Sequence, residues 1–392
     1  MLTILTQPST LSAGRNHIPL RLQSDPSAGS YDEYYITITL RETPVAQTAL
    51  QPIDVSTRFY PPPSGVLDLS LHRILEAYLG TARPNFTIPG VQTFATANRL
   101  VTKYAYEIKD YGDGALLSTI TGNTLYVANA GFGYQSQPDA LDAWVIEGRF
   151  LTQQPRTKLV RPWQREYLTF IMLSTGVLHE LVVETTDSAG TVSTTTTGFS
   201  VSSSQVYLPV AVAVGHDDLG LTPADDVVKY RVWFEVAGSR ASEIMTYVID
   251  PIWSDQDRYY IFQNSLGGYD TLRTTGDLKQ QENVSRIDGQ TWAAGSYDRS
   301  QGRWRSADVR SYESAEQGVG LQANEAGQAW LRDLLRSPEV YRLGDHRPNL
   351  DGSGDLVPIL VEPGSAQVFV DNEFLYGLSF RYRTAFENVG WA

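Results

Sequence analysis

The stretch RYYIFQNSLGGYDTLRTTG, residues 258–276, is the most specific local signal in this sequence. Its flanks are rich in aromatic and β-branched residues, which favour half-buried strands, and they enclose the turn sequence Asn-Ser-Leu-Gly-Gly. Gly267 and Gly268 can supply the positive φ angles that a tight or bulged hairpin requires. Asn264 and Asp270 are typical turn residues, whose side chains bond local backbone. We therefore interpret the stretch as a β-hairpin that forms an architectural corner, and not as a binding site.

The composition predicts a multi-domain protein that folds without disulfides. A chain of 392 residues is long enough for roughly two to four domains, each with its own core. Cys is absent, which excludes disulfides, thiolate metal sites and Cys nucleophiles. The net charge of −13 repels phosphate backbones, so we expect no nucleic-acid partner.

The sequence gives no indication of secretion or of membrane insertion. Residues 1–20 lack a basic region followed by a sustained apolar run, so we expect no signal peptide. The longest apolar stretch, residues 206–214, is too short to span a bilayer. Tyr is abundant and charged residues are few, a combination that suits β-sheets and protein contacts.

Short strand patterns separated by turn residues run through most of the chain, which is typical of β-sandwiches. Residues 34–40 (YYITITL) alternate between two faces, and further strands are expected at residues 100–108, 124–128 and 145–151. The predicted fold is mainly β, with tandem antiparallel β-sandwich domains of the immunoglobulin or fibronectin kind. Two short helices and an extended polar hairpin arm complete it.

Four segments are expected along the chain. Residues 1–98 form an N-terminal β-sandwich with a helix over residues 68–79, which Asp68 would cap, and residues 99–204 form a second β domain. Residues 205–276 form a third β unit that ends in the NSLGGYD hairpin. Residues 277–392 contain the polar arm (277–318), a helix over residues 325–336 and C-terminal strands.

The His residues do not have the spacing of a metal site or a catalytic dyad. They are His17, His72, His179, His216 and His346, without HxH or HExxH spacing. His216-Asp217-Asp218 is interpreted as a solvated turn. His179 and Glu180 are adjacent in a predicted strand, so they point to opposite faces and cannot act on one substrate.

Two further patterns suggest chemistry only weakly. Asp351-Gly352-Ser353-Gly354-Asp355 places oxygen ligands like the first half of a calcium loop, with Glu362 at the twelfth position, but the intervening residues have the pattern of a strand. A polar turn is the favoured interpretation, and calcium is the alternative. Gly131-Phe132-Gly133-Tyr134 lacks the third glycine and the helix of a nucleotide-binding loop.

A glycan-active enzyme is the minority hypothesis. It would need two carboxylates that face one cleft, and the sequence cannot choose among its candidates. These are Asp225, Asp226, Glu235 and Asp250. The Trp residues that could stack on sugars or pack in a core or an interface are Trp163, Trp253, Trp292 and Trp304. We therefore predict no catalytic residues, no cofactor and no metal.

Several segments of the chain form a recognisable combination. They are Phe150-Leu151-Thr152, Pro155-Arg156-Thr157-Lys158, Glu166-Tyr167-Leu168, Ser242-Glu243, Tyr247-Val248-Ile249-Asp250, residues 262–276 and residues 330–341 (WLRDLLRSPEVY). Together they resemble uncharacterised structural proteins from the tail modules of phages and prophages of Bacteroidota, and the resemblance extends over residues 100–392.

This resemblance implies a virion protein of the distal tail, baseplate or fibre attachment, which assembles in the host cytoplasm and is not an enzyme. Its partners would be other copies of itself, other tail proteins and a host surface glycan or receptor. In such a particle, neighbouring copies cover sheet edges and extended arms. We therefore hypothesise that the polar arm contacts another subunit. The alternative is a carbohydrate-binding surface adhesin built from β-sandwiches, which would display a row of exposed aromatic residues.

Overall fold

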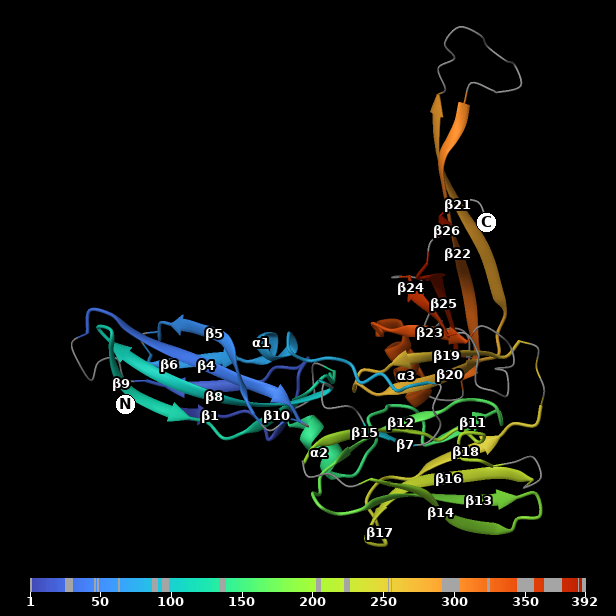
Figure 1. The fold of residues 1–392 in the computed structure, drawn as a ribbon, viewed down its shortest axis with the longest axis horizontal. Helices are drawn as coiled ribbons and strands as arrows, with labels where there is room; N and C mark the ends of the chain where they lie inside the picture. The colour runs from blue at the N-terminus through green and yellow to red at the C-terminus, as the bar shows by residue number, and fades with distance from the viewer. Residues whose placement is uncertain are drawn as a thin grey trace. The chain divides into compact units, whose positions relative to one another are not determined.

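The computed structural model is mainly β, which confirms the predicted fold class. It describes residues 2–24, 31–45, 47, 49–62, 64–86, 91–93, 99–133, 139–201, 206–221, 226–252, 254, 256–290, 304–322, 325–343, 356–362, 376–386 and 388–389. Nearly all strand pairs in this part of the chain are antiparallel (Figure 1). The strands pair in parallel at β2–β10 and at β11–β18.

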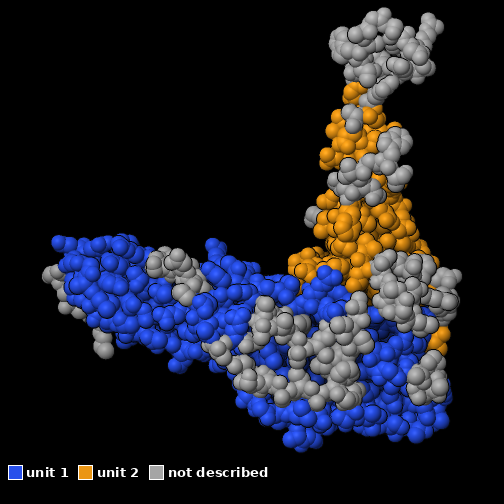
Figure 2. All heavy atoms as spheres, viewed as in Figure 1, with its two compact units in different colours: residues 1–250, 264–270 blue, residues 251–263, 271–392 orange. Residues whose placement is uncertain are grey.

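The chain divides into two compact units (Figure 2). Unit 1 contains Met1–Asp250 and Asn264–Asp270, and unit 2 contains Pro251–Gln263 and Thr271–Ala392. The chain therefore passes between the units three times: after Asp250, after Gln263 and after Asp270. The short segment Asn264–Asp270, with which the chain returns to unit 1, is the tip of the hairpin at residues 258–276.

The first sandwich of unit 1 packs two sheets around an aliphatic core. Leu20 and Leu22 of one sheet and Ile36, Ile38 and Tyr104 of the other belong to this core, and all five are buried. The smaller sheet contains β1 (Thr3–Thr6), β3 (Pro19–Gln23) and β6 (Val66–Ser70). The larger contains β2 (Leu11–Ala13), β10 (Leu125–Ala128), β8 (Val101–Gly112), β4 (Tyr34–Pro44), β5 (Gln51–Phe59) and β9 (Ala115–Thr121).

The expected boundary at residue 98 falls inside this sandwich. β4 and β8 are neighbours and pair from Tyr34↔Gly112 to Pro44↔Thr102. Residues on both sides of the expected boundary therefore share one sheet. β7 (Val91–Thr93), which precedes that boundary, pairs instead with β15 of the second sandwich.

The helix predicted over residues 68–79 is wrong in its start and its length. Helix α1 covers only His72–Glu76, and its N-cap is Leu71. Asp68 lies in β6, where it pairs with Arg21 of β3. Cross-strand pairing therefore outweighs the local capping pattern, because a strand next to a buried partner gains ladder hydrogen bonds and packing that a free helix end lacks.

The second sandwich of unit 1 is built around aromatic rings. Phe150, Phe170 and Phe234 are all buried, and the rings of Phe170 and Phe234 stack with centroids 5.2 Å apart. The larger sheet contains β11 (Thr157–Val160), β18 (Met245–Ile249), β16 (Val227–Val236), β13 (His179–Asp187), β14 (Val192–Val201) and β17 (Ser239–Arg240). The smaller contains β12 (Tyr167–Met172), β15 (Leu208–Ala213) and β7.

The strand predicted over residues 145–151 is also wrong. Helix α2 covers Ala140–Ile146, and the residues that follow it up to Leu151 form no strand. Leu141 and Val145 are the buried residues of α2, and their i, i+4 spacing puts them on one helix face. The apolar cluster after Val145 masked this pattern in the sequence.

Unit 2 consists of one twisted sheet and one helix. Helix α3 (Glu325–Arg336) confirms the helix predicted over these residues, and Trp330, Leu331 and Leu334 of α3 join the core around Phe262. The sheet contains, in order, β20 (Tyr269–Thr274), β19 (Arg258–Gln263), β23 (Val340–Leu343), β24 (Leu356–Val361), β25 (Tyr376–Thr384), β22 (Trp304–Gln322) and β21 (Leu278–Gln290), with β26 (Asn388–Val389) beside β22.

The polar arm is a long two-stranded ribbon, as the sequence predicts. β21 pairs with β22 from Leu278↔Gln317 to Gln290↔Trp304. The base of β22, from Ser314 onward, also pairs with β25, whereas its first residues extend beyond that strand (Figure 1). Most described side chains of β21 are exposed. We use the name arm for β21 and β22 together.

Candidate functional site

The hairpin tip is a buried part of unit 1. Asn264 lies at its start, and the side-chain Oδ1 accepts hydrogen bonds from the backbone N–H groups of Leu266 and Gly268, both at 3.0 Å. Gly267 has a φ of 88°, as predicted. The expectation of a positive φ at Gly268 is wrong. Gly268 is needed for space instead, because a Cβ atom there would lie 2.4 Å from the backbone oxygen of Leu151.

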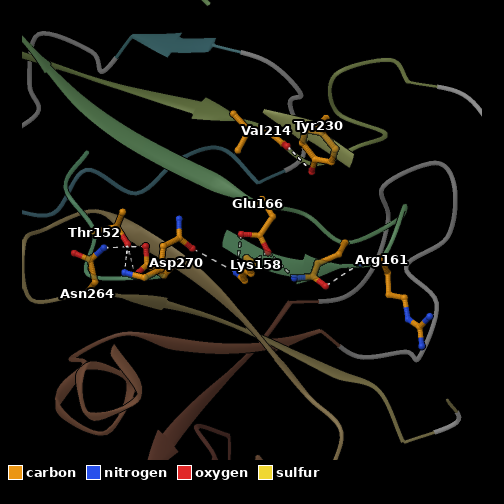
Figure 3. Close-up of polar contacts among 10 residues, drawn as sticks. Thr152, Lys158, Arg161, Glu166, Val214, Tyr230, Asn264 and Asp270 are labelled. Atoms are coloured by element: carbon orange, nitrogen blue, oxygen red, sulfur yellow. Dashed lines mark hydrogen bonds and ion pairs between the residues drawn. The ribbon is translucent and has the colours of Figure 1, made fainter. Parts of the chain in front are cut away.

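The side-chain nitrogen of Asn264 anchors this turn to the rest of unit 1. Its Nδ2 donates to the backbone oxygen of Leu151 at 2.8 Å and to Oδ1 of Asp270 at 3.0 Å. The hydroxyl of Thr152 donates to Oδ2 of Asp270 at 2.9 Å (Figure 3). Asn264, Asp270 and Thr152 are all buried. The Asn264 side chain thus bonds local backbone, as predicted, and also fastens the tip to residues more than a hundred positions earlier.

A buried ion pair lies next to this anchor. Lys158 Nζ contacts both carboxylate oxygens of Glu166, at 2.7 and 2.8 Å. Gln164 Nε2 donates to Glu166 Oε1 at 2.5 Å, and Lys158 also reaches Gln154 Oε1 at 3.4 Å. The Glu166 side chain is fully buried, with an exposed fraction of 0%. Burial raises the pKa of Glu166, and the contacts with Lys158 and Gln164 partly offset this increase.

Arg161 extends these contacts to the end of the first segment of unit 1. Its Nη1 donates to the backbone oxygen of Asp250 at 2.6 Å and lies 3.9 Å from the Asp250 carboxylate. The backbone N–H of Arg161 donates to Oε1 of Gln164, which connects it to the buried ion pair. Arg161 is itself buried. The guanidinium of Arg161 is thus held inside the protein by Asp250, the last residue before the chain leaves unit 1.

These contacts form one continuous chain, which we call the junction network. On the Asn264 side, Gln154 completes the connection, because its backbone N–H donates to Thr152 Oγ1 at 3.0 Å. The network fixes the unit 1 residues next to all three crossings, namely Asp250, Asn264 and Asp270. Its members are Thr152, Gln154, Lys158, Arg161, Gln164, Glu166, Asp250, Asn264 and Asp270. Figure 3 labels six of them, namely Thr152, Lys158, Arg161, Glu166, Asn264 and Asp270.

The junction network is suited to positioning the chain and not to reacting with a substrate. A general acid or base must come within hydrogen-bond distance of the substrate group that it protonates or deprotonates. Glu166 is enclosed, and both of its oxygens already accept hydrogen bonds from Lys158. Burial raises the pKa values of Tyr230 and Tyr247 well above their ordinary range, so both hydroxyls stay protonated. The Tyr230 hydroxyl donates to the backbone oxygen of Val214.

Sequence reasoning did not single out the junction network as a site. Lys158 lies in β11 and Glu166 directly precedes β12, so their contact depends on how the chain turns back between the two strands and not on a local pattern. Six of its members nevertheless lie in segments quoted above for the expected resemblance, which stays a prediction: Thr152, Lys158, Glu166, Asp250, Asn264 and Asp270.

His179 and His216 are buried. His179 is buried in β13 beside the ring of Phe170, and burial lowers its pKa. The interpretation of His216-Asp217-Asp218 as a solvated turn is wrong for His216, which is buried and contacts Asp217 at 2.9 Å. Within the described ranges, no three His, Asp or Glu residues are grouped so as to hold a metal ion.

Asp226 and Glu235, two of the described carboxylate candidates, lie too far apart to form a glycosidase pair. Asp226 precedes β16 and Glu235 lies near its other end, about 30 Å away at the rise of an extended strand. Catalytic carboxylates in glycosidases are about 5–10 Å apart. Glu235 instead accepts a hydrogen bond from the Trp233 ring, and Asp250 belongs to the junction network.

Several candidates from the sequence lie outside the residues that the structure describes. These are Asp225, Trp253, Trp292, His346 and the Asp351–Asp355 loop. Of the two remaining Trp candidates, Trp163 is half-buried with the Arg161 guanidinium 6.0 Å from its ring centroid, and Trp304 begins β22.

Asp218 is a half-buried residue near the junction network, and its carboxyl group has a strongly increased affinity for a proton. Burial raises the pKa of Asp218 to about 6; Asp217 adds to this increase, and the Arg165 guanidinium opposes it. The Asp218 Oδ2 atom is buried and accepts no hydrogen bond from the described residues. The folded protein therefore binds a proton here more tightly than the unfolded chain, whose Asp pKa is near 3.8.

We expect this group to make the protein less stable as the pH rises from about 4 to about 6. The stabilisation that protonated Asp218 contributes is fully present below its pKa in the unfolded chain, 3.8. It is lost as the pH rises through its pKa in the folded protein, about 6. Asp218→Asn should remove this pH dependence and be more stable than the unsubstituted protein above pH 6. The free energy of unfolding, measured with urea at pH 4 and pH 7, reports this pH dependence. Asp68→Asn, at a site with a side chain 71% exposed, is the control, and an unchanged slope in Asp218→Asn would contradict the assignment.

A polar groove lies at the base of the arm. It has a volume of about 390 Å³, and the Arg383 guanidinium lies 5.6 Å from the ring centroid of Tyr312 in its wall. Carboxylate, amide and guanidinium groups all line it. The lining includes Lys279, Gln281, Asn283, Tyr312, Glu316 and Arg381.

The comparisons with known proteins do not place this chain in a family. No family model matches it, and no curated protein matches it. Among solved structures, a structure titled "Plexin A4 full extracellular region" aligns over 98% of this chain with 9% sequence identity and a TM-score of 0.16. The chain spans 36% of the length of that structure. A similarity this low carries no argument about fold or function. None of the described helices is long and apolar enough to cross a membrane.

Proposed function

We propose that this protein is a structural component of a bacteriophage tail, in the distal tail, baseplate or fibre-attachment region. It acts by protein–protein assembly, with other copies of itself and other tail proteins as partners, and it assembles in the host cytoplasm. A host surface glycan or receptor is a further partner in this proposal. The observation that carries the proposal is the arm, a long exposed ribbon at the edge of a well-packed sheet.

The arm combines a buried base with an exposed outer part. At its base, Ala315, Gln317 and Val319 of β22 are buried, and Gln317 accepts a hydrogen bond from the hydroxyl of Tyr260. Farther out, β21 exposes both polar and aliphatic side chains, including Val284 and Ile287. A ribbon that extends beyond its own core gains stability when another chain covers it, and an uncovered sheet edge invites pairing.

The junction network supports the same conclusion for the rest of the molecule. Its buried charges contact the unit 1 residues at which the chain enters or leaves that unit: Arg161 binds Asp250, and Asp270 accepts a hydrogen bond from Asn264. Buried polar networks of this kind specify one arrangement of the chain. A protein whose role is mechanical attachment needs defined crossings more than it needs a reactive pocket.

Shortening the arm tests this function. The complete deletion of residues 277–318 would remove the buried base, so the cut should fall farther out. We would replace residues 282–313 with Asn-Gly, which joins the paired residues Gln281 and Ser314 by a two-residue hairpin turn. Ser314–Gln322 and their pairing with β25 remain. We expect the full chain to form oligomers in light scattering and negative-stain microscopy, and the shortened chain to remain a folded monomer.

Two results would contradict the proposal. One is oligomers of the same size from the shortened chain, with circular dichroism showing that both proteins are folded. The other is the absence of this protein's peptides from purified tailed particles that are produced by a host carrying its gene. The second result would overturn the tail assignment even if the arm mediates association.

A carbohydrate-binding adhesin is the second candidate function, and the groove at the arm base favours it. Tyr312 offers an aromatic ring, and Asn283 and Glu316 offer hydrogen-bonding groups of the kind that bind sugar hydroxyls. A glycan array with the full chain distinguishes the two functions. Binding that Tyr312→Ala abolishes, together with a monomeric full chain, would favour the adhesin.

A further inference from the structure

β21 is the last strand of the unit 2 sheet. The strand order is β20-β19-β23-β24-β25-β22-β21, so one long side of β21 has no neighbour among the described strands. Thirteen residues, Leu278–Gln290, present this side. A sheet edge of this length offers a row of backbone donors and acceptors for a further strand.

The hydrogen bonds at the arm base indicate which residues of β21 face that open side. The backbone N–H of Gly318 donates to the oxygen of Asp277 at 2.9 Å, so Asp277 directs its backbone groups toward β22. Antiparallel strands alternate between bonded and non-bonded pairs. Even-numbered residues up to Arg286 therefore direct their N–H and C=O groups to the open edge. A bond on the other side of β22 gives the same result. The backbone N–H of Glu362 donates to the oxygen of Arg381 in β25, so Arg381 directs its backbone groups away from β22. Its partner in β22, Glu316, therefore directs its own backbone groups toward β21.

The side chains of these even-numbered residues are complementary to themselves. Glu282, Val284 and Arg286 project from one face of β21, and all three are exposed. Glu282 and Arg286 are equally spaced on either side of Val284. If a second β21 pairs antiparallel about a two-fold axis at Val284, each Glu282 lies opposite an Arg286, and the two valines meet at the centre.

We propose that two copies of this chain associate through their β21 edges, antiparallel and in register about Val284. The inference rests on the proposed assembly function and names its contact. Opposite charges that face each other across strands favour this register, whereas a shift by two residues removes both pairs. A two-fold contact is self-complementary, so one strand supplies both halves. Within the described ranges, neither Glu282 nor Arg286 has an ion-pair partner in its own chain, so both charges are available.

Cysteine cross-linking tests the register, and the Cys-free chain makes the result unambiguous. Bonded antiparallel partners have Cα atoms about 5.5 Å apart, within the range of a disulfide. Val284→Cys should therefore form a disulfide-linked dimer under mild oxidation. The control is Ile287→Cys, since Ile287 is exposed to a similar degree, 60% against 50% for Val284. Its two copies would be about 20 Å apart in this register, so it should not cross-link.

Charge reversal tests the pairing by an independent route. Glu282→Lys and Arg286→Glu each place like charges opposite each other twice, so each variant should associate roughly tenfold more weakly or worse. The double variant restores both opposite pairs and should associate as the unsubstituted chain does. A mixture of the two single variants should form heterodimers, because the introduced lysine of one copy then faces the introduced glutamate of the other. Analytical ultracentrifugation measures all four cases.

The outcomes separate this inference from the proposed function. If shortening the arm abolishes assembly, but Val284→Cys does not cross-link in preference to Ile287→Cys, the register is wrong and the function stands. The same conclusion follows if neither the double variant nor the mixture restores association. If the single-charge variants assemble like the unsubstituted chain, the edge is protected by its charges and does not pair.

Discussion

Replacing Lys158 with Met is expected to lower the free energy of unfolding of unit 1 by about 3–5 kcal/mol. The substitution keeps most of the side-chain volume but leaves the fully buried Glu166 carboxylate without its counter-charge. Gln164 alone then stabilises the carboxylate, at 2.5 Å. Chemical denaturation followed by tryptophan fluorescence measures the loss.

Two controls separate the buried ion pair from ion pairs in general. Arg21→Met breaks the exposed pair with Asp68, whose side chains are 51% and 71% exposed, and should cost no more than about 1 kcal/mol. Lys158→Met combined with Glu166→Gln removes both charges and keeps an amide near Gln164, so it should recover most of the loss. If the single Lys158→Met variant is as stable as Arg21→Met, the junction network does not depend on this charge.

Replacing Asn264 with Ala is expected to cost roughly 3 kcal/mol or more, because several buried backbone groups lose a hydrogen-bond partner at once. The amide accepts from Leu266 and Gly268 and donates to the Leu151 oxygen and to Asp270. We also expect the hairpin tip to open locally, so limited proteolysis should cut near residue 266 before the rest of unit 1 unfolds.

Asn283→Ala is the matched control on the arm. Asn283 is only half-buried, and its Nδ2 donates to Ser314 Oγ at 2.6 Å. Its loss should change the stability by no more than about 0.5 kcal/mol. Equal effects of the two substitutions would mean that the Asn264 amide is one turn residue among many, and that the tip is held mainly by the packing of Leu266.

The buried ion pair and the hairpin anchor use their charges and amides inside unit 1, next to Asp250, Asn264 and Asp270. The arm, by contrast, exposes most of the described side chains of β21. The proposed assembly function requires both a fixed chain path and an exposed edge.

The sequence by itself determined the fold class and most strands, because alternation and turn residues are local properties. The spacing of apolar side chains and the positions of Gly, Asn and Pro alone predict three elements. These are the hairpin at residues 258–276, the strand at residues 34–40 and helix α3. The long polar arm was also predictable, since a stretch with many charges and spaced aromatic residues cannot form a closed core.

Only the tertiary structure decided where local signals compete with distant partners. Asp68 caps no helix, because β6 pairs with β3, and residues 145–151 form no strand, because Leu141 and Val145 bury one face of α2. The pairing of Lys158 with Glu166, and of Asn264 with Leu151, depends on segments that meet only after folding. Lys, Glu, Asn and Asp are usually surface residues, and here they form a network because they are buried together. No local sequence pattern indicates that a charged side chain will be buried.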